Sequence, residues 1–150
     1  MKDSYQAICE LLYTYAERLD LGDYEGVADL FSHASITREG YEEKATGRDA
    51  VLKRYTSRTR KHADGTPRTK HVTTNPIVDV DDEAGKATCR AYFTVLMQIR
   101  GEFALQPIIA GRYHDRFERV DGQWRFENRH IISELIGDLS HHLVGDNRVR

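Results

Sequence analysis

The spacing of apolar residues predicts that the chain begins with a helix. The apolar residues that recur every three or four positions, and so share one helical face, are Ile8, Leu11, Leu12, Tyr15 and Leu19. Asp3 or Ser4 is suited to cap the first turn, because a short polar side chain accepts hydrogen bonds from the free backbone N–H groups there. Gly22 then ends the helix, since glycine readily adopts the left-handed conformation that follows many helices.

A second, shorter helix and a weakly alternating segment are predicted next. Asp23 is the expected cap of this helix. Its buried face consists of Val27, Leu30 and Phe31. Residues 34–46 alternate around Ile36 and are interrupted by Gly40, as expected of a short bent strand or hairpin.

A third helical pattern opens at residues 47–49. Its apolar positions are Val51, Leu52 and Tyr55. The pattern then dissolves into residues 56–67, which are basic and rich in turn-forming residues and therefore predict a surface loop.

From residue 68 onward, alternation with a period of two predicts long strands. The expected strands cover residues 72–80, 87–99, 108–120 and 123–135. The turns between them are residues 81–85, residues 101–106 and the pair Asp121-Gly122. Such short connections join antiparallel neighbours. Strands of about a dozen residues must bend, and the expected positions of bulges or kinks are Pro76, Gly101 and Gly111.

Three helices followed by a meander of long strands predict an α+β fold. In this fold, one face of a curved antiparallel sheet packs on about three N-terminal helices and leaves a concave mouth suited to a small apolar ligand. A chain of 150 residues is long enough for one hydrophobic core and too short for two independent ones. We therefore expect a single domain over residues 1–150.

Charge and composition exclude several classes of protein. The 22 basic and 24 acidic residues are spread along the chain, which argues against nucleic acid as a partner. No apolar run approaches the roughly 18 residues that a membrane span needs, and no apolar signal core opens the chain. Cys9 and Cys89 lie in apolar-periodic segments without metal-binding or disulfide spacing, so we expect buried thiols and a cytoplasmic protein.

The seven histidines show no metal-binding spacing, and the sequence has no glycine-rich phosphate loop or dinucleotide motif. We therefore expect neither metal nor cofactor. His71 is the most conspicuous candidate for chemistry, because it lies in an otherwise apolar and hydroxylic strand. Alternation places His71, Thr73 and Asn75 on one face. The pattern alone favours a structural role for His71 and a helix-end role for Asp20.

The chain resembles the SnoaL-like branch of the nuclear-transport-factor-2-like fold. The resemblance is carried by residues 15–31, by the run His71-Val-Thr-Thr-Asn75, and by Gly111 through Trp124. The motifs are most similar to those of scytalone dehydratase and the lindane dehydrochlorinase. The resemblance implies a cone-shaped domain in which Asp20 orients His71 as a general base. It also implies a cofactor-independent lyase or isomerase acting on a small apolar cyclic compound.

Further site residues follow from the same resemblance. Arg129 falls near an arginine implicated in the dehydrochlorinase, and Met97 stands where scytalone dehydratase has a second histidine. Tyr15 is expected either to pack in the core or to point its hydroxyl into the pocket. Tyr113 lies near Gly111, where a ligand has room to approach. Asn75 is expected either to line the mouth of the cavity or to be a bulge residue before Pro76. The expected substrate-binding residues are Tyr15, Asn75, Met97 and Tyr113, and Arg129 is expected to assist catalysis.

Two alternatives remain open at this point. The first is a polyketide cyclase, and the second is a non-catalytic module that binds a ligand or dimerises. Residues 87–99 alternate with apolar residues on both faces, which predicts a homodimer or homotrimer through the sheet. The polar tail after Gly137 is expected to fray or to contribute to such a contact.

Overall fold

Capping side chains start the first two helices where the sequence predicts them. In the computed structural model, which describes residues 2–145, the Asp3 carboxylate accepts a hydrogen bond from the Gln6 N–H at 2.7 Å. The Asp23 carboxylate does the same for the Gly26 N–H at 2.9 Å. Gly22 separates the two helices with φ of +74°. A side chain there would meet the Gly65 carbonyl oxygen at 2.3 Å, so the turn requires glycine.

Residues 2–145 form three helices and six strands. In order, they are α1 (Ser4–Asp20), α2 (Tyr24–Asp29), β1 (Ser35–Arg38), β2 (Lys44–Thr46), α3 (Arg48–Arg58), β3 (Thr69–Asp81), β4 (Lys86–Ile99), β5 (Phe103–Val120) and β6 (Gln123–Ile136). The α+β class and the curved sheet over three helices confirm the prediction. The largest differences in boundaries are that α3 runs to Arg58, that β3 already begins at Thr69, and that the turn before β5 ends earlier, so that Phe103 already pairs with Ile99.

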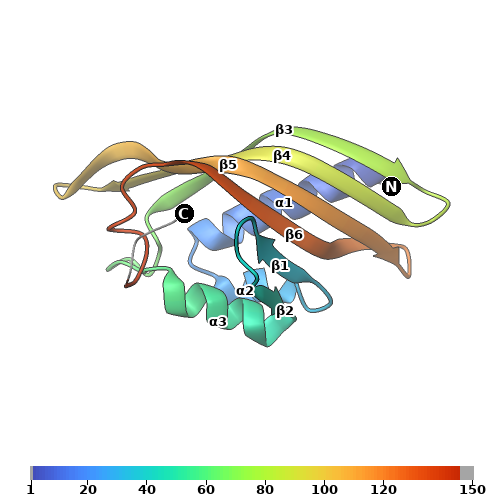
Figure 1. The fold of residues 1–150 in the computed structure, drawn as a ribbon, viewed down its shortest axis with the longest axis horizontal. Helices are drawn as coiled ribbons and strands as arrows, with labels where there is room; N and C mark the ends of the chain where they lie inside the picture. The colour runs from blue at the N-terminus through green and yellow to red at the C-terminus, as the bar shows by residue number, and fades with distance from the viewer. Residues whose placement is uncertain (1, 146–150) are drawn as a thin grey trace.

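The strands form one sheet in the order β2-β1-β6-β5-β4-β3. The four long strands are antiparallel neighbours, as predicted, whereas β1 runs parallel to β6. The sheet is therefore mixed rather than purely antiparallel. In Figure 1 the long strands arch over α1, while α2, α3 and the β1–β2 hairpin lie beneath the same concave face.

Two of the expected bends are register shifts in the sheet. In β3 the register shifts between Thr74 and Ile77, where Asn75 has φ of +57°. The β5–β6 register shifts at Gly111, and a side chain there would meet the Ile132 carbonyl oxygen at 1.9 Å. Gly101, by contrast, lies in the turn between β4 and β5. The bulges bend the long strands around the helices and set which side chains face inward.

The hydrophobic core lies between the concave face of the sheet and the helices. Phe31 of α2 stacks on Phe126 of β6 with ring centroids 4.8 Å apart, and Phe93 of β4 stacks on Tyr113 of β5 at 4.5 Å. Trp124 is only half-buried and donates a hydrogen bond to the Ser4 hydroxyl at 3.1 Å. Phe93 and Tyr113 line the cavity described next.

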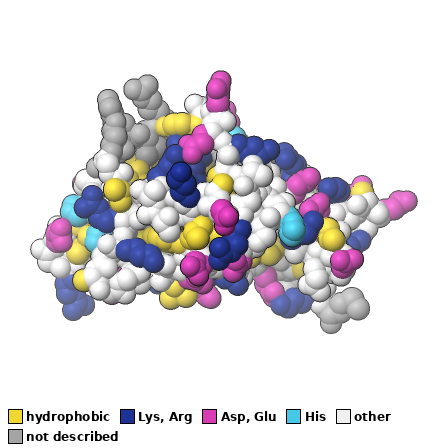
Figure 2. Space-filling model, turned by 90° about the horizontal axis from the view of Figure 1, so that it is seen from below, with side chains coloured by type: hydrophobic (Ala, Val, Ile, Leu, Met, Phe, Trp, Pro, Cys, Tyr) yellow, Lys and Arg dark blue, Asp and Glu magenta, His cyan; other side chains and the backbone are white. Residues whose placement is uncertain are grey.

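The outer surface mixes charges of both signs. Figure 2 shows basic and acidic side chains interspersed over the face seen from below. Among residues 2–145, no helix is both long and apolar enough to cross a membrane.

Candidate active site

A small cavity of about 140 Å³ opens between the helices and the concave face of the sheet. Its walls are mostly apolar and aromatic, with a few polar side chains among them. The apolar and aromatic lining consists of Tyr15, Leu19, Tyr55, Phe93, Val95, Ile109, Tyr113, Ile131, Leu139 and Leu143. The polar lining consists of Arg38, Arg54, Arg58, Thr59, His71, Ser133 and His142. An apolar pocket with a few convergent polar groups is typical of sites for small molecules.

His71 and Asp20, predicted as a pair, are in direct contact. The His71 Nδ1 atom lies 2.6 Å from Asp20 Oδ1, and the His71 backbone N–H donates to Asp20 Oδ2 at 2.8 Å. Thr69 donates its hydroxyl to Asp20 Oδ1 at 2.9 Å. Asp20 is the last residue of α1, and the two side chains are 11% (His71) and 9% (Asp20) exposed. The end of α1 is therefore held against β3 by the carboxylate itself.

This arrangement suits His71 to accept a proton. An ionised carboxylate only accepts hydrogen bonds, so the Nδ1 of His71 carries the hydrogen and Nε2 has the free lone pair. Nε2 has no hydrogen-bond partner within residues 2–145. His71 lines the cavity, whereas Asp20 lies behind it. A carboxylate in this position fixes the tautomer and stabilises the imidazolium formed on protonation.

Tyr15 and Tyr113 both line the cavity, as the sequence predicts. The Tyr15 hydroxyl hydrogen-bonds with the hydroxyl of Tyr55, a residue of α3 that was expected only as part of the helix core. Burial raises the pKa of Tyr15 and of Tyr113, so both phenols stay protonated at neutral pH. They are available as hydrogen-bond donors or as part of the aromatic floor.

Arg129 is fully buried and does not line the cavity. Its Nε and Nη2 atoms donate to the Asp115 carboxylate at 2.9 and 2.8 Å, and its guanidinium carbon lies 3.6 Å from the Tyr113 ring centroid. The pairing follows from strand register, because Asp115 and Arg129 are opposite one another on β5 and β6 and both face inward. Arg129 therefore lies behind the tyrosine floor, one layer away from any ligand.

The structure does not bring Asn75 or Met97 to the cavity. Asn75 is exposed at the bulge of β3, where its left-handed backbone ends the alternation that starts at His71. Met97 is buried on β4 beyond the cavity, opposite Thr69. Neither position supports the contact with substrate that the motif implies.

His142 is a cavity residue that the sequence does not reveal. Residues 139–144 fold over the mouth: the Arg60 N–H donates to the His142 carbonyl oxygen at 2.8 Å, and Leu143 pairs with Thr59. The expectation that the tail frays is thus wrong for this segment; residues 146–150 lie outside the described part. The His142 Nδ1 atom is buried without a hydrogen-bond partner among the described residues. Burial is the largest cause, and the nearby His71 the next, of a lowering of the His142 pKa to about 4.

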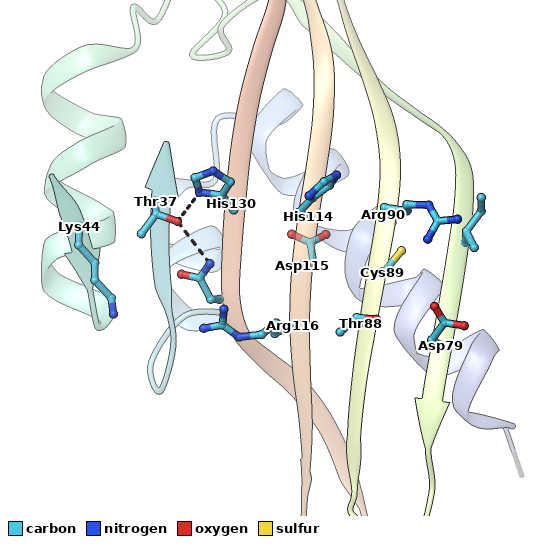
Figure 3. A pocket seen from close by; sticks show the side chains of 12 residues that line it. Thr37, Lys44, Asp79, Thr88, Cys89, Arg90, His114, Asp115, Arg116 and His130 are labelled. Atoms are coloured by element: carbon cyan, nitrogen blue, oxygen red, sulfur yellow. Dashed lines mark hydrogen bonds between the residues drawn. The ribbon is translucent and has the colours of Figure 1, made fainter. Parts of the chain in front are cut away.

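A larger groove of about 630 Å³ lies on the opposite, convex face of the sheet (Figure 3). Its most notable side chain, His130, is engaged at both ring nitrogens, with Thr37 Oγ1 at 2.8 Å and Glu39 Oε2 at 2.7 Å. It therefore lacks the free nitrogen that His71 has. No group of three or more potential metal ligands occurs within residues 2–145.

The curved sheet and the helices beneath it define the chain as a cone-shaped α+β domain, with a histidine–carboxylate pair at a small cavity between the two layers. The profile of the SnoaL-like domain family matches residues 3–130, and the chain belongs to this family.

Solved structures share the fold across most of the chain. A proposed scytalone dehydratase from Novosphingobium aromaticivorans is 25% identical, with a TM-score of 0.70, over 97% of this chain and 89% of that one. LinA is 21% identical, with a TM-score of 0.69, over 91% and 90%. ActVI-ORFA from Streptomyces coelicolor is 17% identical, with a TM-score of 0.68, over 87% and 96%. No curated protein sequence matches this chain.

Proposed function

We propose that the protein is a cofactor-independent lyase or isomerase, of the dehydratase or dehydrochlorinase type, in which His71 removes a proton from a small cyclic substrate. The observation that carries this proposal is the 2.6 Å contact between Asp20 and His71 at the wall of a small cavity. The free Nε2 of His71 is the base, and Asp20 orients it. A cyclase would use the same first step.

The proposed elimination moves one proton to His71 and expels the leaving group. His71 Nε2 takes a proton from a substrate carbon, the C–H electron pair becomes a double bond, and the bond to the leaving group breaks. A halide leaves with that electron pair. A hydroxyl leaves as water after receiving a proton from the His71 imidazolium. The positioned base accounts for about 10²- to 10⁴-fold of rate, and orientation in a dry site supplies much of the remainder.

The size and lining of the cavity support a compact ring as substrate. An apolar cavity of about 150 Å³ is large enough for benzene, and this one measures about 140 Å³. The walls next to His71 include Phe93, Val95 and Ile109. Such walls exclude water, which strengthens the electrostatic effect of Asp20 on the charged imidazole.

The test compares His71→Ala and Asp20→Asn with the wild type. Ligands that co-purify with the protein are identified by native mass spectrometry, and these compounds and related ring alcohols and halides are assayed for elimination. We expect His71→Ala to lower kcat by about 10²- to 10⁴-fold, and Asp20→Asn to do so by a comparable factor because it loses the orienting charge. His33→Ala, on an exposed histidine, serves as the control. Full activity in His71→Ala would refute the proposal.

We further propose that two or three copies of the chain associate through the convex face of the sheet. Large apolar side chains are exposed on that face at Val72, Ile77, Tyr92 and Leu135. Assembly through this face leaves the cavity on the other side accessible, so it is compatible with catalysis and with a purely ligand-binding role.

Cytoplasmic localisation is part of the same proposal. Cys9 and Cys89 are both buried as free thiols, which is typical of proteins from a reducing compartment. Cell fractionation tests it directly.

A further inference from the structure

Three arginines line the same cavity as His71. Arg54 and Arg58 are one turn apart on α3 and therefore share a face. Arg38 ends β1 opposite Ile131, another lining residue, and this register turns its side chain inward. Three guanidinium groups from two elements thus converge on one opening.

The positive charge of this cluster is only partly balanced. Arg58 donates to the Glu43 carboxylate at 2.6 and 2.8 Å. Arg38 lies over the Tyr41 ring at 3.9 Å and Arg54 near the Tyr55 ring at 6.0 Å, but neither has an ion-pair partner among residues 2–145. Three cations therefore face one carboxylate.

Arginines elsewhere on the surface are usually paired, for instance Arg48 with Asp29 and Arg112 with Glu134. Arg38 and Arg54 are half-buried like these two, but they have no carboxylate partner among residues 2–145 and lie beside each other at a cavity. Burial, together with the charge of Arg54, lowers the pKa of the Arg38 guanidinium. Like charges that are held together away from water cost free energy, and a bound anion removes that cost.

We propose that the substrate carries an anionic group, a carboxylate in the first instance, that is bound by Arg38 and Arg54 while the ring enters the cavity toward His71. This inference rests on the proposed function and refines the expected substrate from an apolar ring to a ring with an acidic substituent. Guanidinium groups suit a carboxylate because their N–H donors match its two oxygens. Their positive field also stabilises negative charge that develops on the ring when His71 removes a proton.

The test measures binding of three matched probes by isothermal titration calorimetry: benzoate, neutral benzamide and phenyl phosphate. We expect benzoate to bind wild-type protein at least about tenfold more tightly than benzamide, with a preference that weakens as ionic strength rises. Arg38→Gln and Arg54→Gln should each weaken benzoate binding by about tenfold and leave benzamide unchanged, since each removes charge-assisted hydrogen bonds. Arg54→Lys, which retains the charge, should recover part of the loss.

Arg90→Gln on the convex face is the control, because it removes the same charge far from the cavity. Equal affinity for benzoate and benzamide, or an equal loss in Arg90→Gln, would overturn the proposal. A preference for phenyl phosphate over benzoate supports the anion site and assigns it a phosphate ester instead. If the protein prefers benzoate but shows no turnover that depends on His71, the anion site is supported and the proposed enzyme is refuted. If it turns over a neutral ring compound in a His71-dependent way but does not prefer benzoate, the enzyme is supported and the anion site is refuted.

Discussion

Two histidines, His71 and His142, line the same cavity, but the groups around the two rings differ. His71 has the Asp20 carboxylate behind it, which compensates a positive charge on the ring. His142 has no such partner: its Nδ1 atom is buried and unpaired among the described residues, and burial holds its pKa near 4. At neutral pH His142 is therefore an uncharged group, able to hydrogen-bond a ligand but poorly suited to take up a proton.

Replacing His142 by Gln should flatten the dependence of stability on pH. In the unfolded chain the imidazole takes up a proton near its ordinary pKa of about 6.5, but in the folded protein only near 4. The contribution of this histidine to the free energy of unfolding is fully present above about pH 6.5. It decreases as the pH falls toward 4, by an amount on the order of 3 kcal/mol. The titratable groups that face the ring are His71, His62 and Asp20.

Urea unfolding at neutral pH and at about pH 4.5 measures this effect. His33→Gln, which alters an exposed histidine, provides the matched control and should follow the wild type. A variant His142→Gln with the same loss of stability between the two conditions as the wild type would contradict the interpretation.

At the scale of elements, the C-terminal segment 139–144 completes the cavity. It is attached by backbone hydrogen bonds to the end of α3, including Val144 N–H to the Arg58 carbonyl oxygen at 2.9 Å, and His62 Nε2 lies 2.9 Å from the His141 carbonyl oxygen. Leu139 is 4% exposed and belongs to the hydrophobic core. The segment is thus a packed part of the fold rather than a loose end.

Substituting Leu139 by Ala should destabilise the protein by about 2–4 kcal/mol, because it removes buried methyl groups and leaves a cavity under the segment. The free energy of unfolding from urea titration tests this. Leu21→Ala, at a leucine that is 63% exposed, should cost less than about 0.5 kcal/mol. If the two variants lose equal stability, Leu139 does not anchor the segment.

At the scale of the whole molecule, the two faces of the sheet expose different kinds of side chain. The concave face holds the cavity and the Asp20–His71 pair. The convex face exposes apolar side chains and the groove of Figure 3, where Arg90, His114 and His130 point away from the helices. A sheet that is covered by helices on one side and apolar in part on the other is typical of a subunit.

A charge placed on the convex face should therefore dissociate the assembly. Tyr92 is 54% exposed there, and Tyr92→Glu would bury an unpaired carboxylate in the contact. Sedimentation should give a dimer or trimer for the wild type and the 17.3 kDa monomer for the variant. Leu21→Glu, outside this face, should leave the assembly intact. A monomeric wild type would argue against association through the sheet.

The sequence alone determines the helices, the long strands and most turns, because these depend on local apolar periodicity and on capping or glycine residues. Asp3, Asp23 and Gly22 act within a few residues of their own position, so their effect is readable without the fold. The pairing of Asp20 with His71 could also be predicted, from motifs that resemble those of the SnoaL-like family. Pattern alone favoured structural roles for both.

Tertiary structure decided which side chains meet. A single bulge turned Asn75 away from the face of His71, and strand register buried Arg129 against Asp115 instead of exposing it to a ligand. Folding of the C-terminal segment over α3 brought His142 into the cavity beside arginines that lie far from it in the chain. Register and chain closure are long-range properties, and a shift of one residue reverses the direction of every side chain in a strand. The contact between Asp20 and His71 could be predicted through the family resemblance, whereas the cavity, its second histidine and its arginines could not, because they depend on these long-range properties.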